Sequence, residues 1–183
     1  MTSSRIEDII KYAKTLIGIK YTWWIGGPLD KNKHPFYINN KPTISYLKKN
    51  GTNCTGFINI LRHKAGKIVH GSGEWKGGIG GWYDYFKKKK VLKKFNDTKD
   101  YELGTLFLRR YRDVNDQGHV AVYINKYKIN NKNKLLYGDI IHSFDFNKDN
   151  TGINITSLGW SHFWDKCGYY EYSISPEDWL FSD

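Results

Sequence analysis

Apolar residues recur at helical spacing in two segments of the first third of the chain. Residues 4–17 place isoleucine, alanine and leucine three and four positions apart, after a Ser-x-x-Glu sequence that is typical of a helix start, and Gly18 follows. A second pattern runs to Gly66, and its apolar positions are Cys54, Phe57, Ile58, Leu61 and Ala65. Both patterns predict helices that bury one side.

The second half of the chain changes to the period of β-strands. Residues 104–108 form a short apolar run, and residues 134–142 and 169–174 predict further strands. Residues 119–124 alternate between two faces, with Val120, Val122 and Ile124 on one and His119, Ala121 and Tyr123 on the other. Because the helices precede the strands without βαβ alternation, we predict an α+β fold with N-terminal helices packed on an antiparallel sheet.

Polar and glycine-rich segments join these elements. Residues 29–50 contain prolines, lysines and asparagines that are typical of a long surface insertion, and residues 125–134 read as a polar loop between strands. Glycines concentrate in residues 71–81, which predicts a further loop. We predict a single domain, residues 1–183, with insertions near 29–50 and 125–134.

Composition limits the class of protein and its location. The chain has 39% hydrophobic and 16% aromatic residues, which is typical of a folded globular domain. No apolar run approaches the ~20 residues of a membrane helix, and the N-terminus lacks the form of a secretory signal. The two cysteines lie far apart, which favours a reducing compartment. We therefore predict no transmembrane segment and a cytoplasmic or virus- or phage-associated protein.

The formal net charge of +11 favours an anionic partner. Residues 82–86 predict a short helix that runs into a lysine cluster, formed by Lys87, Lys88, Lys89, Lys90, Lys93 and Lys94. The cluster is either a solvated face or a patch that binds wall polymer, lipid or nucleic acid.

Cys54 stands where a loop ends and a helix begins. Thr52 and Asn53 are both good helix-capping residues, so Cys54 falls in the first helical turn. The N–H groups and dipole of a helix start favour an anion, which predicts a lowered thiol pKa and a nucleophilic sulfur. The alternative is a small buried cysteine with a packing role only.

A nucleophilic thiol needs a base, and His119, at the head of a predicted strand, is the best candidate. The alternative is an inert, hydrogen-bonded strand histidine. The other histidines outside the predicted strands, His34, His63, His70 and His162, lie in polar or loop-like contexts. No spacing of histidine and cysteine fits a zinc site, so we predict no metal and no cofactor.

The aromatic segment that includes Tyr21, Trp23 and Trp24 precedes a Gly-Gly-Pro turn. It predicts either a short strand packed in the core or the wall of a cleft, because neighbouring side chains on an extended chain point to opposite faces.

Four stretches, in this order, resemble the NlpC-type cell-wall cysteine peptidases, a branch of the papain-like superfamily. They are Tyr21-Thr-Trp-Trp-Ile-Gly-Gly27, Asn53-Cys-Thr-Gly-Phe57, Gly104-Thr-Leu-Phe-Leu108 and Gly118-His-Val-Ala-Val-Tyr-Ile124. The family's third catalytic position, a polar residue on the next strand, corresponds to His142 within Ile140-Ile-His-Ser-Phe144, with Asp139 as the second choice. Asn53 and Thr55 replace the family's usual Asp and Ser.

The resemblance implies a papain-like NlpC-type fold and a thiol hydrolase that cuts amide bonds of peptidoglycan stem peptides. In this interpretation Cys54 is the nucleophile, His119 the base and His142 the residue that orients the base. Tyr21 would help to bind the oxyanion, and Trp23 and Trp24 would contact substrate. The alternatives are an acyltransferase, a lipid amidase or a protease of the same fold, and an inactive polyanion-binding module.

Overall fold

The computed structural model of the chain describes residues 2–23, 36–39, 41–70, 76–96, 99–113, 115–126, 138–145, 151–159 and 170–183. Its helices are α1 (Thr2–Thr15), α2 (Ile44–Asn50), α3 (Cys54–Lys64), α4 (Ile79–Lys88) and a C-terminal π-helix, η1 (Glu177–Phe181). Its strands are β1 (Lys93–Lys94), β2 (Leu106–Arg109), β3 (His119–Asn125), β4 (Asp139–Asp145), β5 (Thr151–Ser157) and β6 (Tyr172–Ile174).

Within the described residues the six strands form one sheet, in the order β1-β6-β2-β3-β4-β5. Each neighbouring pair is antiparallel. The register of β2 against β3 pairs Leu106 with Val122 and Arg109 with His119. Helices followed by an antiparallel sheet confirm the α+β class.

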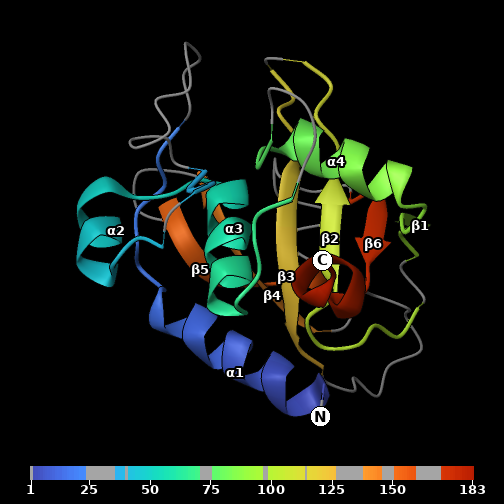
Figure 1. Cartoon of the computed structure of the whole chain (residues 1–183), viewed down its shortest axis with the longest axis horizontal. Coiled ribbons are helices and arrows are strands. Elements are labelled where there is room, and N and C mark those ends of the chain that lie inside the picture. Colours follow the sequence, from blue (N-terminus) through green and yellow to red (C-terminus); the bar gives the residue numbers. More distant parts are fainter. Residues whose placement is uncertain are drawn as a thin grey trace.

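The helices pack against one face of the sheet, with α3, α4 and η1 in front of it in Figure 1. Val120, Val122 and Ile124 lie in the same buried cluster as Phe57 and Leu61 of α3. The opposite face carries a second buried cluster, which includes Ala121 and Tyr123 of β3. The two faces predicted for residues 120–124 are therefore confirmed, and the sheet is covered on both sides.

The sequence did not predict α2, β1, β5 or η1, and for α2 and β5 the reason is that local signals are weak. Residues 44–50, within the predicted insertion, form the short helix α2, which Thr43 caps by accepting a hydrogen bond from the N–H of Tyr46. Residues 151–157 form β5, whose Ile153 faces the main core. Residues 29–35 and 40 of the first predicted insertion and residues 127–134 of the second lie outside the described residues.

A buried arginine fastens the C-terminal segment to α3. Arg62 is fully buried, and its guanidinium donates to the carbonyl oxygens of Ile68, of Trp179 at 2.6 Å and of Ser182 at 2.7 Å. Burial lowers the pKa of Arg62 to about 10, so the group remains charged at neutral pH. Two of these charge-assisted hydrogen bonds, to Trp179 of η1 and to Ser182 at its end, tie the C-terminal segment to the helix that starts at Cys54.

We predict that Arg62→Met lowers the free energy of unfolding by about 2–4 kcal/mol, because it removes the donor to the buried carbonyl oxygen of Trp179 and the donors to two partly buried ones. Chemical denaturation measures this change. The matched control is Arg5→Met, since Arg5 is exposed and stacks on the ring of Phe181, 4.5 Å from its centroid. It should cost less than about 1 kcal/mol. Equal losses in the two variants would contradict the fastening role of Arg62.

Candidate active site

Cys54 is the first residue of α3, as the sequence predicted. Asn53 is the N-cap, and its Oδ1 accepts hydrogen bonds from the N–H of Gly56 at 2.8 Å and from the hydroxyl of Thr55 at 3.2 Å. The cap satisfies a helix N–H that would otherwise lack a partner, and it fixes where the first turn begins.

The residue before this cap is held from two sides. The carbonyl oxygen of Thr52 accepts from the Ser143 hydroxyl of β4 at 2.9 Å and from the N–H of Thr22 at 3.2 Å. The N–H of Thr52 donates to the carbonyl of Lys20 at 3.1 Å, and Tyr21 and Thr52 form an isolated parallel bridge. The segment at Tyr21 and the strand β4 therefore fix the start of α3 together.

His119 begins β3, directly after a glycine whose conformation is needed there. Gly118 has φ of +75°, and a Cβ on it would lie 2.5 Å from the carbonyl oxygen of Arg109. Only glycine adopts this backbone without a clash, so the chain turns tightly into the strand at His119.

The ring of His119 is linked to His142, its neighbour on β4. Nε2 of His119 lies 2.7 Å from Nδ1 of His142, and Nε2 of His142 lies 3.0 Å from the hydroxyl oxygen of Thr156 on β5. Both histidines are buried, with 2% and 0% of their surface exposed. A row of hydrogen-bonding groups therefore crosses three strands and ends at His119.

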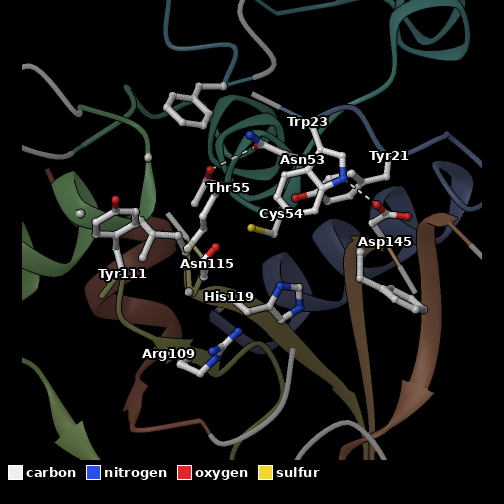
Figure 2. A pocket seen from close by; sticks show the side chains of 17 residues that line it. Tyr21, Trp23, Asn53, Cys54, Thr55, Arg109, Tyr111, Asn115, His119 and Asp145 are labelled. Atoms are coloured by element: carbon white, nitrogen blue, oxygen red, sulfur yellow. Dashed lines mark hydrogen bonds between the residues drawn. The ribbon is translucent and has the colours of Figure 1, made fainter. Parts of the chain in front are cut away.

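Cys54 and His119 line the same pocket of about 350 Å³. Figure 2 shows the sulfur of Cys54 and the ring of His119 turned toward the same space. The pocket is lined by Tyr21, Trp23, Phe36, Asn53, Cys54, Thr55, Gly78, Ile79, Gly80, Arg109, Tyr111, Asn115, Gln117, Gly118, His119, Phe144 and Asp145. A thiol and an imidazole thus meet at the base of a cavity large enough for a small substrate group.

Burial has a larger effect on the pKa of the Cys54 thiol than its position at the start of a helix does. It raises the pKa of the Cys54 thiol to about 11, although hydrogen bonds from the backbone N–H groups of Val120, Thr55 and Cys54 itself favour the thiolate. The sequence prediction of a lowered pKa is therefore wrong for the free protein. The helix start contributes in the predicted direction, but the loss of solvent around the sulfur outweighs it.

Both histidines of the row are neutral at pH 7. Burial, then the neighbouring His142 and Arg109, lower the pKa of His119 well below its usual value, and burial lowers the pKa of His142 to about 3. A neutral imidazole has one donor and one acceptor nitrogen. If His142 donates from Nε2 to Thr156, its Nδ1 accepts from Nε2–H of His119, which leaves Nδ1 of His119 as the basic nitrogen.

The structure places the other predicted site residues as follows. Tyr21 and Trp23 line the pocket, Trp23 with 48% of its surface exposed, whereas Trp24 lies outside the described residues. Asp139, the second choice for the orienting position, accepts instead from the side-chain amide of Asn125 at 3.0 Å.

The remaining histidines lie elsewhere or outside the described residues. His63 Nε2 is 3.0 Å from the carbonyl oxygen of Tyr37, and His70 stacks on Tyr85 with 4.3 Å between ring centroids. Neither lines the pocket. His34 and His162 lie outside the described residues, as does Cys167.

Sequence reasoning missed the charged residues of the pocket, Arg109 and Asp145. Trp23 donates from Nε1 to Asp145 at 2.5 Å, so this pair joins the Tyr21 segment to the end of β4. The signals were weak: Arg109 ends an apolar run and Asp145 follows one, which is typical of many surface positions. Thr156 was missed because β5 itself was not predicted.

No protein-family model and no curated protein sequence matches the chain. Among solved structures, it is similar to a lipoprotein-like protein of the NLP/P60 family from Staphylococcus aureus. The two have 16% sequence identity and a TM-score of 0.49, over 94% of this chain and 41% of that one. The chain thus spans about two fifths of the length of that structure.

The described residues contain neither a membrane-spanning helix nor a cluster of metal-binding side chains. Among them, no helix has the length and apolar character needed to cross a membrane. Also within these ranges, no three side chains of His, Cys, Asp or Glu gather in a way that could hold a metal ion.

We predict that iodoacetamide modifies Cys54 of the folded protein at a rate that keeps rising from about pH 7 to about pH 10. The reason is the raised thiol pKa, because only the thiolate reacts. Peptide mapping separates Cys54 from Cys167. In denaturant, the same cysteine should show a midpoint near pH ~8.5. A plateau at neutral pH in the folded protein would show a preformed thiolate and contradict this prediction.

Proposed function

We propose that this protein is a thiol hydrolase that cleaves amide bonds, with Cys54 as nucleophile, His119 as base and His142 as the residue that orients the base. The observation that supports this most strongly is the pocket in which Cys54, at a helix start, and His119 share one cavity, while His119 is hydrogen-bonded to His142. A nucleophile, a base and an orienting group on three separate elements are what such catalysis requires.

The first half of the reaction forms a thioester. The Cys54 proton passes to Nδ1 of His119 as the sulfur attacks the amide carbonyl carbon and the carbonyl oxygen becomes an oxyanion. Collapse of this intermediate breaks the C–N bond, and the leaving amine takes the proton from His119. Because thiol and imidazole are both neutral in the free pocket, we place the proton transfer in the same step as the attack.

The second half releases the acid. Water gives a proton to His119 and attacks the thioester, and the thiol of Cys54 leaves with that proton. The backbone N–H of Cys54, at the open end of α3, is the donor we assign to the oxyanion, with the Tyr21 hydroxyl as a second donor. Donors fixed in advance at the site of developing charge are commonly the largest contribution to such catalysis.

For the substrate, we propose the stem peptides of peptidoglycan. The support is the resemblance of four sequence stretches to the NlpC-type peptidases, together with the positions of their key residues. One pocket is lined by residues from three of these stretches: Tyr21, Cys54 and His119. His142 is hydrogen-bonded to His119.

The test is digestion of purified peptidoglycan followed by mass analysis of the released fragments. We expect fragments with a new amine and a new carboxylate from the wild type and none from Cys54→Ala. His119→Ala should lower kcat by about 10²–10⁴-fold, the usual contribution of a general base. His142→Ala should lower kcat less, and His142→Asn should recover part of the loss, because its side-chain oxygen accepts a hydrogen bond near the position of Nδ1.

Other outcomes would correct the proposal at different points. Full activity in His142→Ala would remove His142 from the orienting role. Turnover of acyl amides of lipids or proteins, with peptidoglycan left intact, would replace the substrate. Binding of anionic polymer with no hydrolysis of any amide would identify an inactive binding module.

The lysine cluster contains none of the residues that line the pocket. Its six lysines are exposed on the end of α4 and on the edge strand β1, which adjoin in Figure 1. Three of them lie over tyrosine rings, at 5.6–5.9 Å from the centroids: Lys87, Lys89 and Lys94. In the part of the chain that the structure describes, none of the six forms an ion pair. We propose that the patch binds anionic wall polymer.

We predict that a fourfold Lys→Gln variant of Lys87, Lys88, Lys93 and Lys94 binds anionic wall polymer more weakly and with a flatter salt dependence. Exposed charges more than ~8 Å apart are largely screened at physiological ionic strength, so a charge-driven contact weakens with salt. Hydrolysis of a small peptide should not change. The control replaces four exposed lysines of α1 and α2, Lys11, Lys14, Lys48 and Lys49, which gives the same net charge.

An equal loss of binding in both variants would mean that only the net charge matters. Tighter binding to lipid vesicles or nucleic acid than to wall polymer would change the partner. If small-peptide turnover falls while polymer binding persists, the patch belongs to catalysis and not to docking.

A further inference from the structure

Two residues with fixed charges, Arg109 and Asp145, line the described part of the pocket. In Figure 2, Arg109 lies beside His119, on the side of the pocket away from Trp23 and Asp145. The carboxylate of Asp145 accepts the hydrogen bond from Trp23. The two charges are therefore on different walls, and the function proposed above assigns no role to Arg109.

The strand register places Arg109 next to the reacting groups. Arg109 is the last residue of β2 and pairs with His119 on β3. Residues paired in this way point to the same face of a sheet, with Cβ atoms ~5 Å apart. The Arg109 side chain is only 13% exposed, so its charge lies largely out of solvent, beside the base.

Asp116 orients Arg109 but is shared with a second arginine. One carboxylate oxygen of Asp116 pairs with Nη1 of Arg109, and the other accepts from Nη1 of Arg112 at 3.0 Å. Arg112 in turn pairs with Glu171 at 3.1 Å, and Glu171 also pairs with Arg110 at 3.5 Å. Among the described residues, Asp116 and Glu171 are the acids that pair with these three arginines. Asp113 turns its carboxylate to the backbone N–H groups of Asn115 and Asp116 instead.

The positive charge of Arg109 reaches both reacting side chains. It lowers the pKa of the Cys54 thiol and contributes to the low pKa of His119. The second effect hinders catalysis, because His119 must become an imidazolium during the attack. A substrate anion next to Arg109 would offset that charge and make protonation of His119 easier in the bound state.

We propose that Arg109 is a specificity-determining residue that binds a carboxylate of the substrate beside the scissile amide. The guanidinium fork matches a carboxylate in two hydrogen bonds, which a neutral amide group does not offer. Tyr111, Asn115 and Gln117 also line the pocket and bring neutral hydrogen-bonding groups to it. The preferred substrate is thus an anionic peptide. This inference rests on the proposed amide hydrolysis at Cys54.

The test compares two peptides that differ in one group. The first is alanyl-γ-D-glutamyl-lysine, in which a free α-carboxylate lies beside the γ-amide bond, and the second is its α-carboxamide twin. For the wild type we expect kcat/KM to be about ten- to hundredfold higher for the carboxylate peptide, the usual effect of one charge-assisted contact. In Arg109→Gln this ratio should fall to about 1, and the ratio is the readout because loss of the Arg109 charge also changes the rate that the two peptides share.

Two further variants separate substrate binding from support of the loop. Arg109→Lys keeps the charge but not the fork, so it should retain part of the preference. Arg112→Gln removes the other arginine bound to Asp116, and Arg112 does not line the pocket. Its ratio should equal that of the wild type. An equal loss for both peptides in Arg109→Gln, or loss of the preference in Arg112→Gln, would show a structural role and overturn the proposal.

Binding to a catalytically dead protein distinguishes failure of this inference from failure of the proposed function. Calorimetry with Cys54→Ala should show tighter binding of the carboxylate peptide, and the double variant Cys54→Ala/Arg109→Gln should bind the two peptides equally. If neither peptide is cleaved by wild type but this binding pattern holds, the hydrolase proposal fails and the carboxylate site stands. If Cys54→Ala binds both peptides equally, the carboxylate site is wrong whatever the wild type cleaves.

Discussion

The position of Cys54 depends on one peptide unit, that of Thr52. Its carbonyl oxygen accepts from Ser143 and Thr22, and its N–H donates to Lys20. These bonds join three segments: the residues around Tyr21, the start of α3 and the strand β4 that also carries His142. Because His142 is hydrogen-bonded to the ring of His119, the positions of Cys54 and His119 both depend on the same strand. A shift of β4 would move both groups together, which preserves their relative position.

The site combines reactive residue types with an environment that keeps them neutral. Burial raises the pKa of Cys54 and lowers that of both histidines, so a thiolate and an imidazolium are both unfavourable in this pocket. The Asn53 cap is consistent with this balance. Its amide oxygen makes hydrogen bonds that an aspartate could also make, but without a negative charge beside the thiol, which would raise its pKa further.

The sequence predicted the elements whose signals are local. The start of α3 at Cys54 and the two faces of β3 follow from capping residues and periodicity, and the structure contains both. The helix α2 and the strand β5 were missed, because seven-residue segments with few apolar positions carry little periodic signal. Strand pairing brings Arg109 next to His119 and Thr156 next to His142. Such pairing joins residues far apart in the sequence, so local patterns did not predict it. The predicted direction of the Cys54 pKa shift was wrong for the same reason, since the burial of a side chain depends on the tertiary structure.

The covered sheet also explains why the charges of the site lie at its walls. His119 and His142 are enclosed by strands on both sides, and a fixed ion in their place would lose most of its hydration. Arg109 and Asp145 stand instead at strand ends, where Asp116 and Trp23 supply polar partners. The side chains at the bottom of the pocket are neutral, and the charged side chains are on its walls. The protein can therefore fold without an unpaired ion beside the thiol. Under the role proposed for Arg109, the substrate itself then brings the negative charge that assists proton transfer.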